Sequence, residues 1–536
     1  EVTFTRDVAP ILYKNCVECH RPGDIAPMSL LTYKDARPWA RSIRQEVVTR
    51  EMPPWHADPH YGPFANNRSL SQKDVETIAA WVDQGAKEGR EGDLPAVPSF
   101  VNGWLIGQPD VVLTMPQAYD IPANGPDEYI YFTIPTNFKQ DVWVQAAEVR
   151  PGNKKVVHHV IAFVQPPEVA AISKMSGGGD MEEGAFGTGG KSIFYKDGKL
   201  IRVKMDAPVQ DDGCKLPNGG SFFGTSDEDG FGGISLLAGY APGKDVDQWP
   251  AGTAKKIPAG SNIVLQIHYS NFRGAENKPE TDQTSVGLIF AKVPPKKMIV
   301  TMGVENDYFQ LPAGDPNHQV SACYMLKNDV QVIDYMPHMH LRGKDMRYDV
   351  TYPDGRQATL FEVPKFSFNW QTMYHLKEPL TLPKGTKVLV TAHFDNSEGN
   401  KYNPDPRKVV RFGDPTYDEM MIGWIEYAVD VPKERAVAAV DPAIYDQYAG
   451  TYQFTAKIAL TIRRDGSRLL GQAPGTPELE FFPESETKFF LRAIKADLTF
   501  VKNGKSEVTE AVFTMNGFAM HGKRVMPAVA GAGRSK

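Results

Sequence analysis

A cysteine pair with an adjoining histidine lies near the start of the chain, in Cys16-Val17-Glu18-Cys19-His20. Two thiols at this spacing can each add to one vinyl group of a haem, and the imidazole after them then lies beneath the iron. A bare C-x-x-C redox pair and half of a zinc site are the alternatives. Neither accounts for His20 directly after Cys19, and no second cysteine pair occurs later in the chain. The motif therefore predicts covalently attached haem c and one-electron chemistry.

The motif leaves the sixth ligand of such an iron open among Met28, Met52 and His56. We favour Met52, because it precedes Pro53-Pro54-Trp55 and a rigid Pro-Pro turn can hold a thioether in place. Axial His and Met ligands raise the reduction potential of a haem. The alternative is a loop methionine that makes no contact with iron.

A second set of residues with ligand chemistry consists of histidines in strand-like sequence. His158 and His159 are adjacent in an apolar run, His268 lies in another, and His338 and His340 form H-x-H. A strand points alternate side chains to one face, so His338 and His340 can bind one ion. His158 and His159 would point to opposite faces of a regular strand, so sharing an ion requires a bend. Imidazole suits zinc, copper, iron and nickel alike, and histidines that are merely hydrogen-bonded are the alternative.

The element that must position the cysteine motif is a small helical domain over residues 1–95. Apolar residues recur at three- and four-residue spacing over 30–50 and 71–89, which predicts amphipathic helices. Ser71 and Gly89 are typical of a helix start and a helix end. This all-α domain resembles a cytochrome c.

The elements that must position the histidines are short strands. Residues 100–290 and 291–435 consist of β-branched runs separated by Pro, Gly, Asn and Asp, which predicts two β-sandwiches. A glycine-rich insertion is expected within the first, over 165–240. Residues 440–528 again alternate like strands, so a small C-terminal β domain is expected there and the fold class is mainly β.

Composition and charge restrict the kinds of partner that the chain can bind. The chain has 536 residues, too many for one core, with 41% hydrophobic and 23% charged residues, as in ordinary globular proteins. A net charge of −6 without a long basic run argues against nucleic acid. No stretch approaches the roughly 18 unbroken apolar residues of a membrane span.

The chain holds four cysteines, and Cys214 and Cys323 remain after the haem motif is assigned. They form either a disulfide or two separate buried thiols, because sequence does not give their separation. Haem c attachment implies an exported protein, so we expect a periplasmic or secreted location with the signal peptide removed.

Four segments occur in the order found in the copper type II, ascorbate-dependent monooxygenases, which include peptidylglycine α-hydroxylating monooxygenase and dopamine β-monooxygenase. They are His158-His159-Val160, Gln266-Ile267-His268-Tyr269, His338-Met339-His340 and Asp418-Glu419-Met420. Residues 100–435 therefore resemble this family. Its fold is two jelly-roll-like β-sandwiches, in agreement with the strand pattern.

The resemblance implies two separate copper sites. One copper, which transfers electrons, would be held by His158, His159 and His268. The other, which binds O2, would be held by His338, His340 and the thioether of Met420, and a soft sulfur ligand favours Cu(I). Gln266 matches a family residue between the coppers that would orient substrate or a bridging water. Histidines outside these motifs and the haem motif are expected to be structural: His56, His60, His318, His375, His393 and His521.

Departures from the family bear on the substrate. Peptidylglycine enzymes have an arginine two residues before H-x-H, where this chain has Met336. They have asparagine and tyrosine two and four residues beyond the methionine ligand, where this chain has Ile422 and Trp424. An apolar set replaces a carboxylate clamp, so we expect a substrate that is not a peptide C-terminus and is apolar or aromatic.

The C-terminal piece resembles a small β-barrel-like domain often attached to serine hydrolases of the β-lactamase type. The similarity rests on Tyr448-Ala449-Gly450-Thr451-Tyr452, Leu470-Gly471-Gln472 and Phe482-Pro483-Glu484-Ser485-Glu486. No nucleophile motif of such a hydrolase accompanies it. We expect a packing or substrate-shielding module.

Taken together, these features predict a copper monooxygenase that hydroxylates a C–H bond of a small molecule with O2. Its own haem, refilled by an external electron donor, would supply the electrons, because a tethered donor has a high effective concentration. The alternatives are a non-enzymatic haem and copper electron-transfer or copper-binding protein, and an oxidase that releases hydrogen peroxide.

Overall fold

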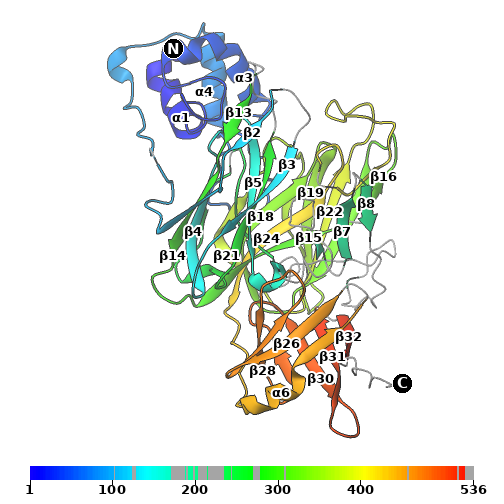
Figure 1. Cartoon of the computed structure of the whole chain (residues 1–536). Coiled ribbons are helices and arrows are strands. Elements are labelled where there is room, and N and C mark those ends of the chain that lie inside the picture. The colour runs from blue at the N-terminus through cyan, green and yellow to red at the C-terminus, as the bar shows by residue number, and fades with distance from the viewer. Residues whose placement is uncertain are drawn as a thin grey trace, which may run out of the picture.

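A computed structural model shows three parts: a helical domain, a β-rich body and a C-terminal barrel (Figure 1). Strands hold 42% of the residues and helices 12%, so the predicted mainly β class is confirmed. The insertion expected over 165–240 lies largely outside the described residues. The structure describes residues 1–101, 103–123, 128–170, 214, 234–242, 244–269, 278–306, 309–413, 415–455, 458–515 and 518–525, and the backbone of 187–188, 191–196 and 199–202.

The helical domain has a core formed by Phe4, Leu12, Ile78 and Trp81, all nearly inaccessible to solvent. The Ser71 hydroxyl accepts a hydrogen bond from the Asp74 backbone N–H, so Ser71 caps the last long helix as its sequence predicts. The elements are η1 (Phe4–Val8), α1 (Ala9–Asn15), α2 (Tyr33–Ala36), η2 (Arg37–Trp39), α3 (Ala40–Val48), α4 (Gln72–Asp83) and η3 (Glu91–Asp93).

One nine-stranded sheet runs through the whole β body, and a parallel pair at its centre joins its two halves. The strand pattern predicts two separate sandwiches, and nothing local in the sequence indicates that they share a sheet. The order is β1 (Val111–Thr114), β14 (Ser285–Phe290), β4 (Val142–Arg150), β11 (Thr253–Ile257), β15 (Lys297–Glu305), β24 (Met421–Asp430), β18 (Val330–Met339) and β21 (Tyr374–Leu382), with β10 (Asp247–Gln248) beside β4.

Two four-stranded sheets cover this long sheet and complete two sandwiches, because each presents an alternating apolar face to it. The first consists of β3 (Glu128–Pro135), β12 (Asn262–Tyr269), β5 (Val157–Gln165) and β9 (Ser235–Tyr240). The second consists of β17 (His318–Met325), β22 (Lys387–Phe394), β19 (Gly343–Thr351) and β20 (Gln357–Val363). Small sheets pair β2 (Tyr119–Ile121) with β13 (Glu280–Asp282), β16 (Gln310–Leu311) with β23 (Val410–Arg411), and β6 (Gly187–Thr188) with β7 (Lys191–Lys196) and β8 (Lys199–Arg202).

The C-terminal domain is a closed barrel, as its resemblance to a small β-barrel-like domain implies. Closure leaves no exposed strand edge. The short helices η5 (Pro442–Ile444) and α6 (Tyr445–Tyr448) precede it. Its strands are β25 (Gly450–Gln453), β26 (Ala459–Asp465), β27 (Arg468–Gln472), β28 (Leu479–Pro483), β29 (Lys488–Phe490), β30 (Ala496–Lys502), β31 (Val508–Met515) and β32 (Phe518–Arg524).

The segment after α3 fastens the helical domain to the second sandwich. The Trp55 ring packs edge-on against Tyr374, with ring centroids 4.9 Å apart, and Phe64 lies in the same buried cluster. Phe64 also forms an isolated bridge with Leu376 of β21. The Asn66 side chain donates a hydrogen bond to the Met373 carbonyl oxygen at 2.8 Å. The helical domain is therefore joined to the body through β21.

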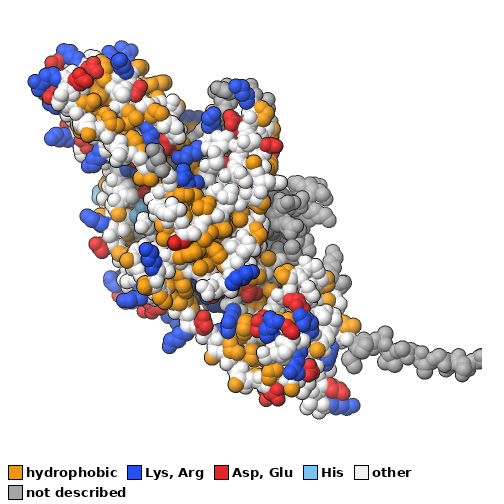
Figure 2. All heavy atoms as spheres, turned by 60° about the vertical axis from the view of Figure 1, so that its left-hand side comes forward, with side chains coloured by type: hydrophobic (Ala, Val, Ile, Leu, Met, Phe, Trp, Pro, Cys, Tyr) orange, Lys and Arg blue, Asp and Glu red, His pale blue; other side chains and the backbone are white. Residues whose placement is uncertain are grey.

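The surface carries mixed charge. Figure 2 shows hydrophobic side chains gathered across the middle of the β body, with Lys and Arg interspersed with Asp and Glu around them. Within the part of the chain that the structure describes, none of the helices has the length and apolar character needed to span a bilayer.

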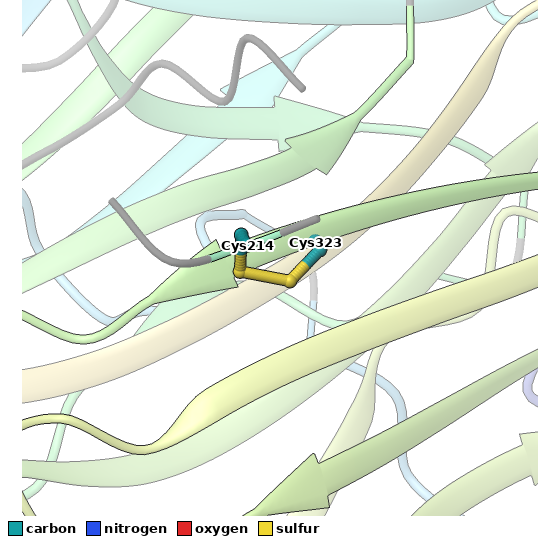
Figure 3. The surroundings of a disulfide bond; sticks show 2 residues. All are labelled: Cys214 and Cys323. Carbon is teal, nitrogen blue, oxygen red and sulfur yellow. A yellow bond between two sulfur atoms is a disulfide. The ribbon is translucent and has the colours of Figure 1, made fainter. Parts of the chain in front are cut away.

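Cys214 and Cys323 form a disulfide (Figure 3) with a Cα–Cα distance of 5.7 Å, which closes a sequence separation of 109 residues. Of the two alternatives that the sequence leaves open, the structure contains the bridge. It ties a residue from the expected insertion to β17 of the second sandwich.

Removing this disulfide should lower the free energy of unfolding by about 2–4 kcal/mol, because a long closed loop restricts the unfolded chain. The measurement is urea unfolding of the Cys214→Ser/Cys323→Ser variant beside wild type. Wild type unfolded with a thiol reductant should match the variant. An unfolding midpoint that neither reduction nor substitution changes would contradict the bridge.

Candidate metal centre between two sandwiches

The first histidine cluster forms because β5 contains an extra residue. His268 of β12 lies opposite His159 of β5, whereas the next residue, Tyr269, lies opposite Val157. His158 is therefore the additional residue of a β-bulge, and a bulge re-aims side chains that a regular strand would send to opposite faces. His158 and His159 can share an ion only if their strand bends between them, and the bulge supplies this bend.

His158, His159 and His268 offer ring nitrogens that all lie within 4.8 Å of one another. The Nδ1 atoms of His158 and His159 are 3.2 Å apart, and Tyr129 stacks on His268 with ring centroids 4.3 Å apart. Burial, together with the neighbouring imidazoles, holds the pKa of His159 well below its ordinary value. A neutral imidazole presents the lone pair that a metal needs.

The second cluster lies at the end of β18. His338 and His340 lie on one face with ring centroids 5.4 Å apart, as the H-x-H spacing predicts. Met420 precedes β24, which pairs with β18 so that Met339 lies opposite Met421. Met420 lines the same cavity as the two imidazoles. Burial lowers the pKa of both His338 and His340, so these rings are neutral at neutral pH.

A buried carboxylate ties the H-x-H segment to the Met420 segment. Glu419 is fully buried and accepts hydrogen bonds from the backbone N–H groups of His340 at 2.8 Å and Arg342 at 2.7 Å. Burial raises the pKa of Glu419 to about 8. His340 Nδ1 lies 3.2 Å from the Asp418 carbonyl oxygen, which leaves Nε2 for a metal.

The loop over residues 364–373, between β20 and β21, contacts both clusters. Gln371 Oε1 lies 2.9 Å from His338 Nδ1, so the amide oxygen accepts the ring N–H and leaves Nε2 for a metal. The Phe368 ring stacks on His158, with centroids 5.4 Å apart, and meets His340 edge-to-face at 5.9 Å. One aromatic ring therefore contacts a histidine of each cluster.

Sequence patterns do not identify Gln371 and Phe368, because these residues lie in a loop without a motif. An amide and a ring of these types are common in loops, so no local signal distinguishes them. Only the fold shows that this loop crosses both histidine clusters.

A cavity of about 140 Å³ lies between the clusters. His159 lines it from the first cluster, and His338, His340 and Met420 line it from the second. Gln266 also lines it and donates a hydrogen bond to the Tyr131 hydroxyl. The two sets of ligands thus share one chamber.

The wall of this cavity beside Met420 is apolar. Met336, Ile422 and Trp424, the positions at which the sequence departs from the peptide-binding pattern, all line it. Ile422 and Trp424 belong to a hydrophobic cluster that continues into the C-terminal barrel through Tyr445 and Phe489. The barrel therefore supports the apolar wall from behind.

The surroundings of the N-terminal motif bear on what its cysteines and histidine could bind. Burial raises the pKa of both thiols, that of Cys16 to about 12, whereas a reactive C-x-x-C pair has lowered values. Among the described residues, the sole group of three or more potential metal ligands is the three-histidine cluster, so a zinc site at Cys16 and Cys19 lacks partners. His20 Nδ1 lies 3.2 Å from the Met28 carbonyl oxygen, which leaves Nε2 for iron.

The three candidates for the sixth iron ligand differ in their surroundings. Met52 is half-buried, and its backbone N–H bonds to the Glu46 carbonyl oxygen at the end of α3. Met28 is held next to His20 by its own carbonyl oxygen. His56 has a buried Nε2 without a hydrogen-bond partner among the described atoms. These contacts do not choose among the three candidates.

Residues 300–449 match the family model described as "Copper type II ascorbate-dependent monooxygenase, C-terminal domain". This part of the chain is therefore similar to the C-terminal domain of that family. It contains His338, His340, Met420 and the 364–373 loop, so the second cluster lies wholly within it. The donor set, imidazole nitrogen with one thioether sulfur, suits copper.

Residues 434–525, which hold the barrel, match DUF3471, a domain of unknown function. A stretch of 69 residues is 38% identical to "Penicillin-binding protein 4*" of Bacillus subtilis (strain 168). It covers 13% of this chain and 15% of that protein, so the chain spans a small part of its relative.

Comparison with solved structures returns distant likenesses. The match to PNGF-II in its C2 crystal form covers 61% of this chain and 66% of the PNGF-II chain, with 7% sequence identity and a TM-score of 0.26. The infectious bursal disease virus VP2 subviral particle covers 60% of this chain and 72% of its own, with 8% identity and a TM-score of 0.16. Likenesses at these scores carry no inference about function.

Replacing His268 with alanine should lower bound copper from two ions per chain to one, because two remaining imidazoles hold the metal more weakly. We expect the copper affinity of that site to fall by at least about 100-fold. Losing a residue that only supports a metal ligand costs up to about 100-fold, and His268 would be a ligand itself. Metal analysis after dialysis measures it.

The matched control is His393→Ala, which removes an imidazole paired with Asp345 at 2.7 Å and away from both clusters. It should retain both ions. Equal copper content in wild type and His268→Ala would contradict the three-histidine site.

Proposed function

We propose that the chain is a copper-dependent monooxygenase that hydroxylates a C–H bond of an apolar, non-peptide small molecule with O2. The observation that carries this proposal is the shared cavity lined by both histidine clusters. A copper-storage protein has no need of a chamber between its metals, whereas a hydroxylase must place substrate beside them. Copper ions bound to both clusters would supply two electrons for reducing O2 as one oxygen atom enters the substrate.

The residues of the cavity have distinct tasks in this proposal. His338, His340 and Met420 hold the copper at which O2 reacts, and His158, His159 and His268 hold the electron-transferring copper. Gln266, fixed by Tyr131, orients the substrate from the side between the clusters. Met336, Ile422 and Trp424 bind its apolar part and exclude water from the reacting carbon.

We further propose that electrons arrive from haem c bound to Cys16, Cys19 and His20, with Met52 as the sixth ligand. The contacts between the parts support this. Trp55, three residues beyond Met52, packs on Tyr374, and that residue comes directly after the loop whose Gln371 supports His338. Packed side chains and short backbone segments are good routes for electrons compared with gaps filled by water.

Ion pairs hold the helical domain in the same position. Asp24, close to the haem motif, lies 3.6 Å from Lys154 of the first sandwich, and Glu51 pairs with Lys365 of the second. A docked donor of this kind would be recharged by an external electron donor at its exposed side. The disulfide between Cys214 and Cys323 supports a periplasmic or secreted location, because such bridges persist in oxidising compartments.

The copper-loaded protein should consume O2 with ascorbate only when a suitable apolar compound is present, and the product should contain one labelled oxygen from 18O2. Mass spectrometry of a small-molecule library measures it. His338→Ala should lose turnover at least about 100-fold, because it removes a ligand at the reacting copper. Peroxide release without a labelled product would support the oxidase alternative, and absence of any O2 uptake would support electron transfer or copper binding.

Met52→Ala should abolish the weak near-infrared charge-transfer band of a Met-ligated ferric haem, while covalent haem content stays unchanged. The optical spectrum and a haem assay of the denatured protein measure both. His56→Ala is the control and should keep the band. A band that persists in Met52→Ala, or that is absent from wild type, would contradict Met52 as the sixth ligand, and absence of covalent haem in wild type would contradict the haem proposal.

A further inference from the structure

A series of titratable groups leads from the surface into the cavity. His375 of β21 is partly exposed, with 27% of its side chain accessible, and its Nδ1 lies 2.5 Å from Asp334 Oδ1 of β18. Asp334 is buried and lies opposite Glu426 of β24 in the antiparallel pairing of β18 with β24. Both carboxyl groups line the cavity that His338 and Met420 also line. None of these three groups is among the proposed metal ligands.

Asp334 and Glu426 are buried carboxyl groups on neighbouring strands that line one cavity. A buried carboxylate disfavours ionisation of a second carboxyl group beside it, so one of the two keeps its proton more readily. Glu426 is the better anion, because Lys255 Nζ lies 2.8 Å away and the Thr301 hydroxyl and the Trp249 indole N–H donate to it at 2.7 and 2.8 Å. The proton therefore resides mainly on Asp334, between a histidine and an anion.

The surroundings of Asp334 and His375 place the pKa of this proton near neutral pH. Burial raises the pKa of Asp334 to about 6, even though His375 acts against this shift. Burial alone would lower the pKa of His375, but its hydrogen bond to Asp334 and the charge of that carboxylate raise it. The titratable and charged groups that face the pair from packed elements are His375, Glu426, Lys255, Lys244 and Asp245.

We propose that His375, Asp334 and Glu426 form a proton relay that supplies the cavity from solvent. Hydroxylation consumes protons: R–H + O2 + 2 e⁻ + 2 H⁺ gives R–OH + H2O. Met336, Ile422 and Trp424, which line the cavity beside Met420, have no carboxyl group or imidazole, so a proton donor elsewhere in the lining meets this need. The proposal rests on the proposed function for its acceptor, whereas the proton on Asp334 is a property of the metal-free chain.

The first test uses the full-length, metal-free protein. Infrared difference spectra across pH 5 to 8 should show a protonated carboxyl band that disappears as pH rises through about 6. Asp334→Asn should remove the band, since asparagine keeps the hydrogen bonds but carries no titratable proton. The control Asp345→Asn, in a pair whose histidine, His393, is as exposed as His375, should retain it. Absence of the band from wild type would overturn the relay.

The second test measures O2 uptake by the copper-loaded protein with ascorbate and the apolar compound that it hydroxylates. In wild type the rate should fall as pH rises above about 6, because the donor is lost. Asp334→Asn should be about 100-fold slower or more and lose this pH dependence, because a positioned general acid contributes about 100- to 10,000-fold. Asp334→Glu should recover part of the rate, and Asp345→Asn all of it.

The outcomes separate the two proposals. An Asp334→Asn protein with full copper content, the wild-type rate and the wild-type pH profile would overturn the relay while leaving the monooxygenase proposal intact. A wild-type protein that binds copper but never consumes O2 would overturn the monooxygenase proposal, and the infrared titration would still decide whether Asp334 holds the proton.

Discussion

The position of both histidine clusters depends on one parallel strand pair. β11 belongs to the first sandwich and β15 to the second, and their pairing makes a single sheet of the two halves. Ile299 and Ala428, from the second half, are buried in the core of the first. Two sandwiches joined only by a linker would move independently, whereas a continuous sheet fixes the chamber between them. The cavity and the side chains that face it depend on this constraint.

Within that frame, desolvation prepares the ligands. Burial disfavours the imidazolium form and lowers the pKa of His159, His338 and His340, so these residues are held as neutral bases. Their orientation is set by neighbours: the amide oxygen of Gln371 and the carbonyl oxygen of Asp418 fix which ring nitrogen remains for metal. The site is thus arranged before any ion arrives.

Short periodicities in the sequence predict part of this arrangement. Alternation places His338 and His340 on one face, and the mainly β class comes from the same pattern. The bulge at His158 is set by pairing with β12, over 100 residues away in the sequence, so no local pattern indicates it. The same holds for Gln371 and for the contact of Asp334 with His375, a histidine that the sequence assigns to a structural role. Those contacts depend on tertiary packing of strands and loops, which spacing does not encode.

The most direct measurement is anomalous diffraction from crystals of the copper-loaded protein at the copper absorption edge. We expect two separate peaks, one among His158, His159 and His268 and one bounded by His338, His340 and Met420. Peaks elsewhere, or no copper at either cluster, would contradict the two-copper chamber.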